Sequence, residues 1–269
     1  MREPEGRRGQ YRRCVLVSAA LVPQTALLVP GAAGRSEVLV DQRRAVGEAT
    51  RSLLAAAPDR VVVVAPGNAL DLTGRLHPTL AAAGLDDDLL GWPSVVLGVG
   101  AAPDDEPTAV DDVGAAVGLH LLARAGWAGP VGVLGVPVTD GLLAQGRALV
   151  DGPERVALLL CASLSARRGP GSPLAEDDRA PALDDAVLAD LAGLGAAPRE
   201  ALDAWNRLAE VPAELATALA VSAWAPWRVL LGALGDDPVL PVRVDVVEVS
   251  VPLGATYAVL VWRRRDEVG

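Results

Sequence analysis

Two histidines, His77 and His120, are the only imidazoles that this chain of 269 residues could use as metal ligands or general bases. A protein metal site usually needs several imidazole or carboxylate ligands that converge. His77 stands beside a proline, in a segment that we expect to be an exposed loop. His120 stands between two leucines in a helical segment, where we expect a nearby group to satisfy its ring nitrogens. The histidines therefore predict no metal centre.

Acidic clusters and serines are the other groups that could do chemistry. The clusters at residues 86–88, 104–106 and 176–178 lack the spacing of an EF-hand, so we expect them to be solvated loops. Ser163 and Ser165 could act as nucleophiles only beside a general base, and no G-x-S-x-G elbow surrounds them. We expect their hydroxyls to cap backbone groups.

Apolar periodicity predicts the elements that position these residues. We expect buried strands at residues 15–20, 61–64, 131–136 and 156–162, helices at residues 41–57, 110–125, 141–150, 184–194, 198–208, 212–223 and 227–234, loops at residues 68–107 and 163–181, and closing strands at residues 243–251 and 255–262. This order predicts an α/β fold with three layers, in which a mostly parallel central sheet is flanked by helices. It also predicts a helical C-terminal insertion and a closing β-hairpin.

The exits of the predicted strands are where a pocket is expected. In open α/β sheets, ligands bind beyond the carboxyl ends of the strands. Most of the candidate groups follow a strand, and one begins a helix. The candidates for the pocket lining are Gln24, Gly67, Asn68, Asp112, Ser163 and Ser165. Taken alone, these residues form no recognisable catalytic set.

The composition limits the class of protein and of partner. Half of the residues are hydrophobic and 22% are charged, which is typical of a globular chain with a sizeable core. The formal net charge of −10 opposes contact with phosphate backbones, so we expect no nucleic-acid partner. The two cysteines, Cys14 and Cys161, lie in apolar runs, which favours buried thiols in a reducing cytoplasm.

The start of the chain has two interpretations. A basic segment at residues 1–13, followed by an apolar stretch at residues 14–29, mimics a secretory signal. The alternative is a buried first strand and a loop, which Pro23 favours because proline interrupts helices. We favour the strand and expect a disordered basic tail, one domain at residues 14–262 and a tail at residues 263–269. We expect a cytoplasmic protein without a membrane-spanning segment.

Six segments along most of the chain follow a family pattern. They are residues 14–31 (CVLVSAALVPQTALLVPG), 61–67 (VVVVAPG), 112–114 (DVG), 160–166 (LCASLSA), 224–235 (WAPWRVLLGALG) and 248–261 (EVSVPLGATYAVLV). Their order resembles the subunit-B-like class III extradiol ring-cleavage dioxygenases, and most closely an actinobacterial group of that family. The first four segments look like the family's Pro-His-Pro, Ser-Pro-His, Asp-His-Gly and Ser-His motifs. The last two look like its late helix and its closing Pro-x-Gly-x-x-Tyr hairpin.

The resemblance implies the catalytic-subunit fold, and in active members an Fe(II) ion held by histidine and by a carboxylate or a further histidine, with another histidine as acid–base. At the matched histidine positions this chain has Gln24, Gly67, Val113 and Ala166. Glutamine is a poor iron ligand, and the other three side chains have no donor atom. The resemblance therefore implies a degenerate dioxygenase-like protein with no catalytic residue of that kind and no bound Fe(II).

Three functions stay open from the sequence. The first is a non-catalytic protein that keeps a pocket for a small molecule or a protein partner, with a homodimer compatible with it. The second is an enzyme with metal-free chemistry in the same cleft. The side chains suspected for that chemistry are Gln24, Asn68, Asp112, Ser163 and Ser165. The third is a residual dioxygenase, an oxidoreductase, completed by a partner subunit. We expect the first.

Overall fold

The computed structural model describes residues 15–90, 95–99, 106–169, 171–172, 174–236 and 240–265. The predicted tail at residues 1–13, Cys14 and acidic residues 104–105 lie outside this part of the chain. The last strand continues to Arg264, so the C-terminal tail starts later than the predicted residue 263.

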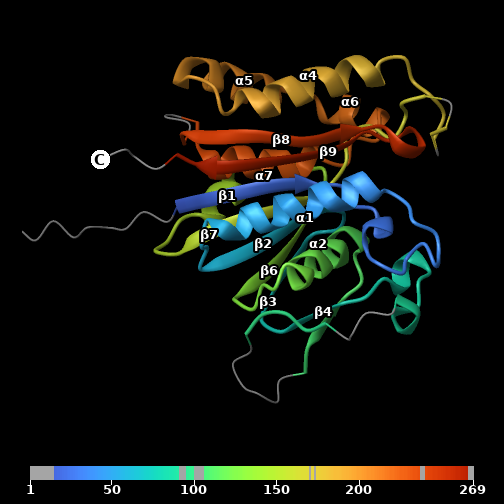
Figure 1. Cartoon of the computed structure of the whole chain (residues 1–269). Helices are drawn as coiled ribbons and strands as arrows, with labels where there is room; N and C mark the ends of the chain where they lie inside the picture. Colours follow the sequence, from blue (N-terminus) through green and yellow to red (C-terminus); the bar gives the residue numbers. More distant parts are fainter. Residues whose placement is uncertain are drawn as a thin grey trace, which may run out of the picture.

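A seven-stranded sheet forms the middle of the molecule, with the strand order β3-β6-β2-β7-β1-β9-β8 (Figure 1). Its strands are β1 (Val15–Val22), β2 (Arg60–Pro66), β3 (Leu70–Thr73), β6 (Val131–Val136), β7 (Arg155–Cys161), β8 (Val242–Ser250) and β9 (Tyr257–Arg264). The four strands from β6 to β1 pair in parallel, while β3, β9 and β8 pair antiparallel. The sheet is therefore mostly parallel at its centre and ends in the predicted β8–β9 hairpin.

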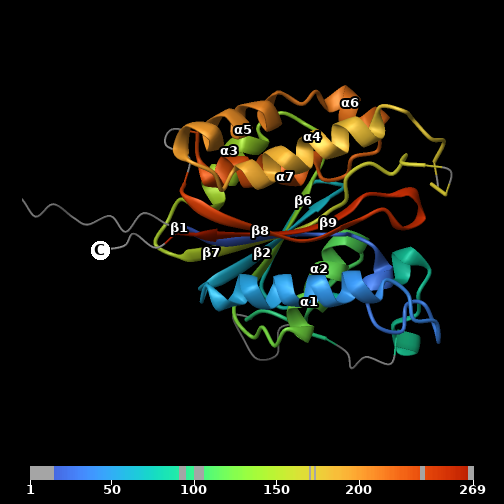
Figure 2. The same cartoon turned by 45° about the horizontal axis from the view of Figure 1, so that its top comes forward.

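Helices cover both faces of this sheet. They are α1 (Val40–Ala55), α2 (Val113–Arg124), α3 (Leu142–Leu149), α4 (Ala180–Gly193), α5 (Pro198–Glu210), α6 (Ala213–Ala218) and α7 (Trp224–Leu234). Figure 2 shows α1 and α2 on one face and α3 to α7 on the other. The predicted three-layer α/β fold with a helical C-terminal part is confirmed. No helix in the described residues has both the length and the apolar character to cross a bilayer.

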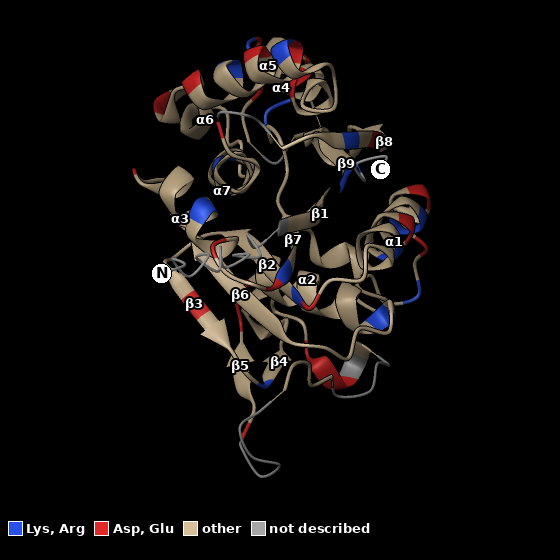
Figure 3. Ribbon diagram, turned by 90° about the vertical axis from the view of Figure 1, so that its left-hand side faces the viewer, with Lys and Arg blue, Asp and Glu red and all other residues tan. Residues whose placement is uncertain are grey.

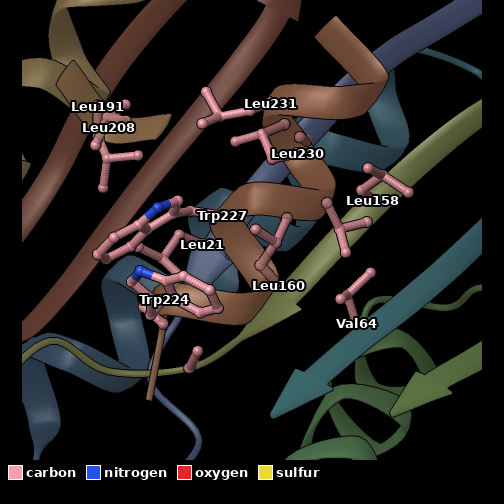
Figure 4. Close-up of a cluster of buried hydrophobic side chains, with 14 of the residues drawn as sticks. Leu21, Val64, Leu158, Leu160, Leu191, Leu208, Trp224, Trp227, Leu230 and Leu231 are labelled. Carbon is pink, nitrogen blue, oxygen red and sulfur yellow. The ribbon is translucent and has the colours of Figure 1, made fainter. Parts of the chain in front are cut away.

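Each face of the sheet has its own hydrophobic core. The core under α7 contains several large side chains, among them Trp227 of α7, Leu160 of β7 and Leu208 of α5 (Figure 4). Trp262 of β9 is also buried there, and its indole N–H donates to the carbonyl of Leu191 at 3.1 Å. The tryptophans supply the bulk that this phenylalanine-free chain needs.

The stretch that we expected to be a loop, residues 68–107, contains structure that the pattern did not predict. Besides β3, it contributes β4 (Leu76–Pro78), which pairs in parallel with β5 (Thr108–Val110) in a separate two-stranded sheet. Two short 3-10 turns, η2 (Ala81–Ala83) and η3 (Asp87–Leu90), follow β4. Val110 therefore belongs to a strand, and the helix predicted from that residue starts later.

Several helix boundaries differ from the prediction, and three of these differences have a local cause. Helix α2 begins at Val113 because the Asp112 carboxylate caps it, accepting from the N–H of Ala115 at 2.9 Å. Helix α6 ends before the predicted residue 223, since Ala220 has a left-handed φ of 53°. Helix α4 begins four residues early, with a proline in its first turn, where proline is tolerated.

Candidate functional site

A cleft lies where the parallel strands β1 and β7 end, which is where ligands bind in this class of fold. Its volume is about 610 Å³. The loops after β1 and β7, the start of α2, helix α6 and the segment before β9 form its walls, and we call it the strand-end cleft. Residues that line it include Gln24, Val113, Ser163, Ala166, Thr217 and Tyr257. The 3-10 turns η1 (Ala26–Leu28) and η4 (Pro252–Gly254) adjoin these walls in the chain.

The lining of the strand-end cleft is neutral. Among the described residues that line it, none is acidic, basic, histidine or cysteine. Its polar groups are the Gln24 amide and the hydroxyls of serine, threonine and Tyr257. Charged side chains gather instead on outer helices such as α1, α4 and α5 (Figure 3). A largely apolar pocket with a few neutral hydrogen-bonding groups suits a small uncharged molecule.

The four positions that the resemblance matches to histidines lie at this end of the sheet. Gln24, Val113 and Ala166 line the strand-end cleft, and Gly67 directly follows β2, beside Asp112. Gly67 has a φ of +151°, and a Cβ added there would lie 2.9 Å from Asp112 Oδ2. These residues do not fit an iron ion, because three lack a donor atom and the fourth is an amide. Within the described residues, no group of three or more His, Cys, Asp or Glu could hold a metal ion.

The six predicted lining residues separate into two groups. Gln24 and Ser163 line the strand-end cleft. Gly67 and Asn68 are exposed at the end of β2, and Asp112 is half-buried as the cap of α2. Of the side chains suspected for metal-free chemistry, the structure thus brings only Gln24 and Ser163 into the cleft.

Ser165 belongs to a buried network centred on Asp184, which is 1% exposed. The Ser165 N–H donates to Asp184 Oδ1 at 3.0 Å and its hydroxyl to Oδ2 at 2.8 Å. The Thr256 hydroxyl donates to the same Oδ2 at 2.5 Å. The prediction that the Ser165 hydroxyl caps the backbone is therefore wrong. This Asp184 network joins the loop after β7 to α4 and to the segment before β9.

The neighbouring loop residue, Ser163, is held by a different side chain. Its N–H donates to the Ser222 Oγ at 2.9 Å, and the Ser222 hydroxyl donates to the Ser163 carbonyl at 3.0 Å. Backbone bonds from Leu164 and to Ser165 pair the same loop with Thr256. These contacts and the Asp184 network fix one wall of the strand-end cleft. The sequence analysis did not single out Asp184, and only the tertiary structure shows its partners.

Cys161 at the end of β7 is fully buried, as predicted for that thiol. Burial raises its pKa well above the ordinary value, and the nearby Asp112 carboxylate adds to the rise. A thiol that stays protonated is a weak nucleophile, so Cys161 contributes packing under α2. A Cβ added at Gly118 of α2 would lie 2.7 Å from its sulfur, which shows how closely the helix approaches.

Both histidines and one acidic cluster lie in surroundings that the sequence did not predict. His77 is half-buried in β4, with Nδ1 2.9 Å from the carbonyl oxygen of Val95, so it is not on an exposed loop. His120 is buried on α2, yet neither ring nitrogen has a hydrogen-bond partner in the described part of the chain. Asp86 and Asp88 are exposed, as predicted for a solvated loop, while Asp87 is half-buried, and all three line a cavity with these histidines.

Comparisons with known proteins add little to this description. No family model matches the chain, and no curated protein is similar to it. A solved structure of an uncharacterized protein from Escherichia coli K12 is similar over 92% of this chain and 99% of that chain, with 16% sequence identity and a TM-score of 0.48. The fold and the site together define an α/β protein with a neutral cleft at the strand ends.

Proposed function

We propose that this chain is a non-catalytic, dioxygenase-like protein that binds a small, mainly apolar molecule in the strand-end cleft. One observation carries the proposal. Three of the four positions that the family resemblance matches to histidines, iron ligands or acid–base, line one cleft, but the side chains there are Gln24, Val113 and Ala166. On this proposal the cleft corresponds to the family's active site, with a lining that is neutral and largely apolar.

The shape and chemistry of the cleft favour a phenol-sized ligand. A volume of about 610 Å³ admits one aromatic ring with short substituents. Apolar groups such as Val113 and Leu164 can contact the ring, while the Gln24 amide can both donate to and accept from a phenolic hydroxyl. A charged ligand would find no opposite charge among the described lining residues, which disfavours it.

The proposal predicts saturable binding of 4-nitrocatechol in a buffer with EDTA, at a pH below the pKa of its phenol groups so that the ligand is uncharged, followed by calorimetry and by the absorbance of the ligand. Thr217 lies exposed on α6 and lines the cleft, so Thr217→Trp should fill it without disturbing the core. We expect binding at least about tenfold weaker in this variant, because the new indole takes the space of the ring.

Ala218→Trp is the matched control for this experiment. Ala218 is the next residue of α6, is also exposed and does not line the cleft, so this variant should bind as the parent does. Equal binding by both tryptophan variants would place the ligand elsewhere. Absence of saturable binding to the parent protein would reject a phenol-sized ligand for this cleft.

A further inference from the structure

A second cavity, with a volume of about 460 Å³, lies between α2, β4 and the turns η2 and η3. We call it the His120 cavity. It is lined by His120 of α2, His77 of β4, the acidic residues 86–88 and apolar side chains that include Leu85 and Leu90. It shares no lining residue with the strand-end cleft among the described residues, so it is a separate site.

His120 is a buried polar group with no partner. Its side chain is 6% exposed overall, and both ring nitrogens are buried without a hydrogen bond within the described residues. Burial lowers the pKa of His120 below its ordinary value of 6.5, so the ring is neutral at pH 7, with one N–H donor and one acceptor. Nearly all buried polar groups in native proteins have a hydrogen-bond partner. An unpaired imidazole beside a cavity therefore points to a ligand in the cavity that forms the missing hydrogen bond.

The charge of the His120 cavity is negative. Residues 86–88 supply three carboxylates, and no arginine lines the cavity in the described part of the chain. Figure 3 shows acidic residues beside β4. Burial alone would raise the pKa of Asp87, but hydrogen bonds from the Leu80 N–H, at 3.0 Å, and from Thr79 outweigh it and lower that pKa. Asp87 therefore stays ionised at neutral pH.

His77 lies in the same wall. Its Nδ1 lies 2.9 Å from the Val95 carbonyl oxygen, which can only accept, so Nδ1 carries a proton and is already paired. The cavity therefore combines carboxylates, the unpaired imidazole of His120 and apolar walls. Because it is many times larger than the roughly 30 Å³ of one water molecule, it has room for an organic molecule.

We propose that the His120 cavity binds a small organic amine that also carries a hydroxyl group. The ammonium group would lie at the carboxylates of residues 86–88, and the carbon chain would contact Leu85 and Leu90. The hydroxyl would meet the imidazole of His120. A bare metal ion fits less well, since no three His, Cys, Asp or Glu side chains of the described residues are placed to hold one.

The test uses 5-amino-1-pentanol as the probe and the full-length chain, with calorimetry and NMR of the imidazole signals. The chain has only two histidines, so the ring signals of His120 can be assigned with a His77→Asn variant. We expect saturable binding that shifts the His120 signals and weakens as salt is added. The matched probes 1-pentanol and 5-hydroxypentanoate, which lack the cation, should not bind.

Three variants separate a ligand site from a structural role. His120→Phe should weaken binding at least about tenfold, while Asp87→Asn should weaken it about fivefold and keep an oxygen for the Leu80 N–H. Asp71→Asn, at an exposed acid of β3 outside the cavity, should leave binding unchanged. The parent should also lose stability relative to His120→Phe as the pH falls below 6.5, because the unfolded chain takes up the imidazole proton first.

Several results would overturn this proposal. Equal binding of 1-pentanol and the amine would show that the carboxylates play no part. Stoichiometric binding of Zn²⁺ that is lost in His120→Phe would make the cavity a metal site. If the amine shows no saturable binding and the His120→Phe variant is as stable as the parent, the amine is rejected as the ligand of this cavity. If His120→Phe fails to fold, the proposal is tested by comparing amine binding in the Asp87→Asn variant with that in the Asp71→Asn variant.

Discussion

Replacement of Asp184 by alanine is expected to lower the free energy of unfolding by about 3–5 kcal/mol, because it leaves buried donors without an acceptor. Asp184 accepts from the N–H and hydroxyl of Ser165 and from the hydroxyl of Thr256, all in a region closed to water. The Arg168 guanidinium, 3.8 Å from the same carboxylate and partly exposed, contributes little. Urea denaturation of the parent and the variant measures the difference.

The neighbouring Asp185 supplies the control for this prediction. Its side chain is 68% exposed and pairs with Arg168 at 3.3 Å, so Asp185→Ala should cost less than about 1 kcal/mol. Asp184→Ala should also weaken 4-nitrocatechol binding, since the Asp184 network fixes a wall of the strand-end cleft. Equal stability of the two alanine variants would show that the buried hydrogen bonds are not formed in solution.

Gly232→Ala is expected to lower the free energy of unfolding by about 2–4 kcal/mol, because helices α3 and α7 touch backbone to backbone. A Cβ at Gly232 would overlap the carbonyl oxygen of Leu143, and a Cβ at Gly146 would overlap that of Val229. A carbonyl oxygen inside a helix cannot turn aside as a flexible side chain can, so the two helices must move apart. Thermal unfolding followed by circular dichroism measures the loss.

Gly47→Ala is the matched helical control, and its expected effect has the opposite sign. Gly47 lies in α1, where an added Cβ would meet only the mobile end of Arg51, at 3.5 Å. Alanine should therefore stabilise this helix by about 0.5–1 kcal/mol through its higher helix propensity. Destabilisation by Gly47→Ala, or a neutral Gly232→Ala, would contradict the packing described for α3 and α7.

The central strands β1, β2, β6 and β7 could be predicted from the sequence because they are covered on both faces. A continuous valine run identified β2, and the apolar segment at residues 131–136 matched β6 residue for residue. Burial on two faces leaves a strong local pattern, so tertiary information was not needed for these strands. The closing hairpin was also predicted, within two residues at each strand boundary.

The small β4–β5 sheet could not be predicted, because strands of three residues are too short to show a period. Val110 fits the apolar spacing of α2 although it lies in β5, and the helix starts only after its N-cap, Asp112. The unpaired state of His120 also has no local signal, since its surroundings come from β4 and η3.

The candidate site was predictable in place but only partly in composition. Parallel strand ends meet at one edge, and of the six residues expected to line a pocket there, Gln24 and Ser163 do line the strand-end cleft. Ser165 follows the same strand but turns to Asp184, a partner 19 residues later in the chain. Which side chain of a loop faces the cleft depends on such partners, and spacing alone does not reveal them.

Oxygen uptake by the iron-treated protein tests the account most directly. The protein is incubated with Fe(II) without oxygen, passed through a desalting column, and then mixed with 3,4-dihydroxybenzoate in air-saturated buffer. Because Gln24, Val113 and Ala166 leave the strand-end cleft without an iron-binding set, we predict no uptake above the protein-free control and no yellow ring-opened product. Uptake of one oxygen molecule for each catechol consumed, with that product formed, would contradict the account.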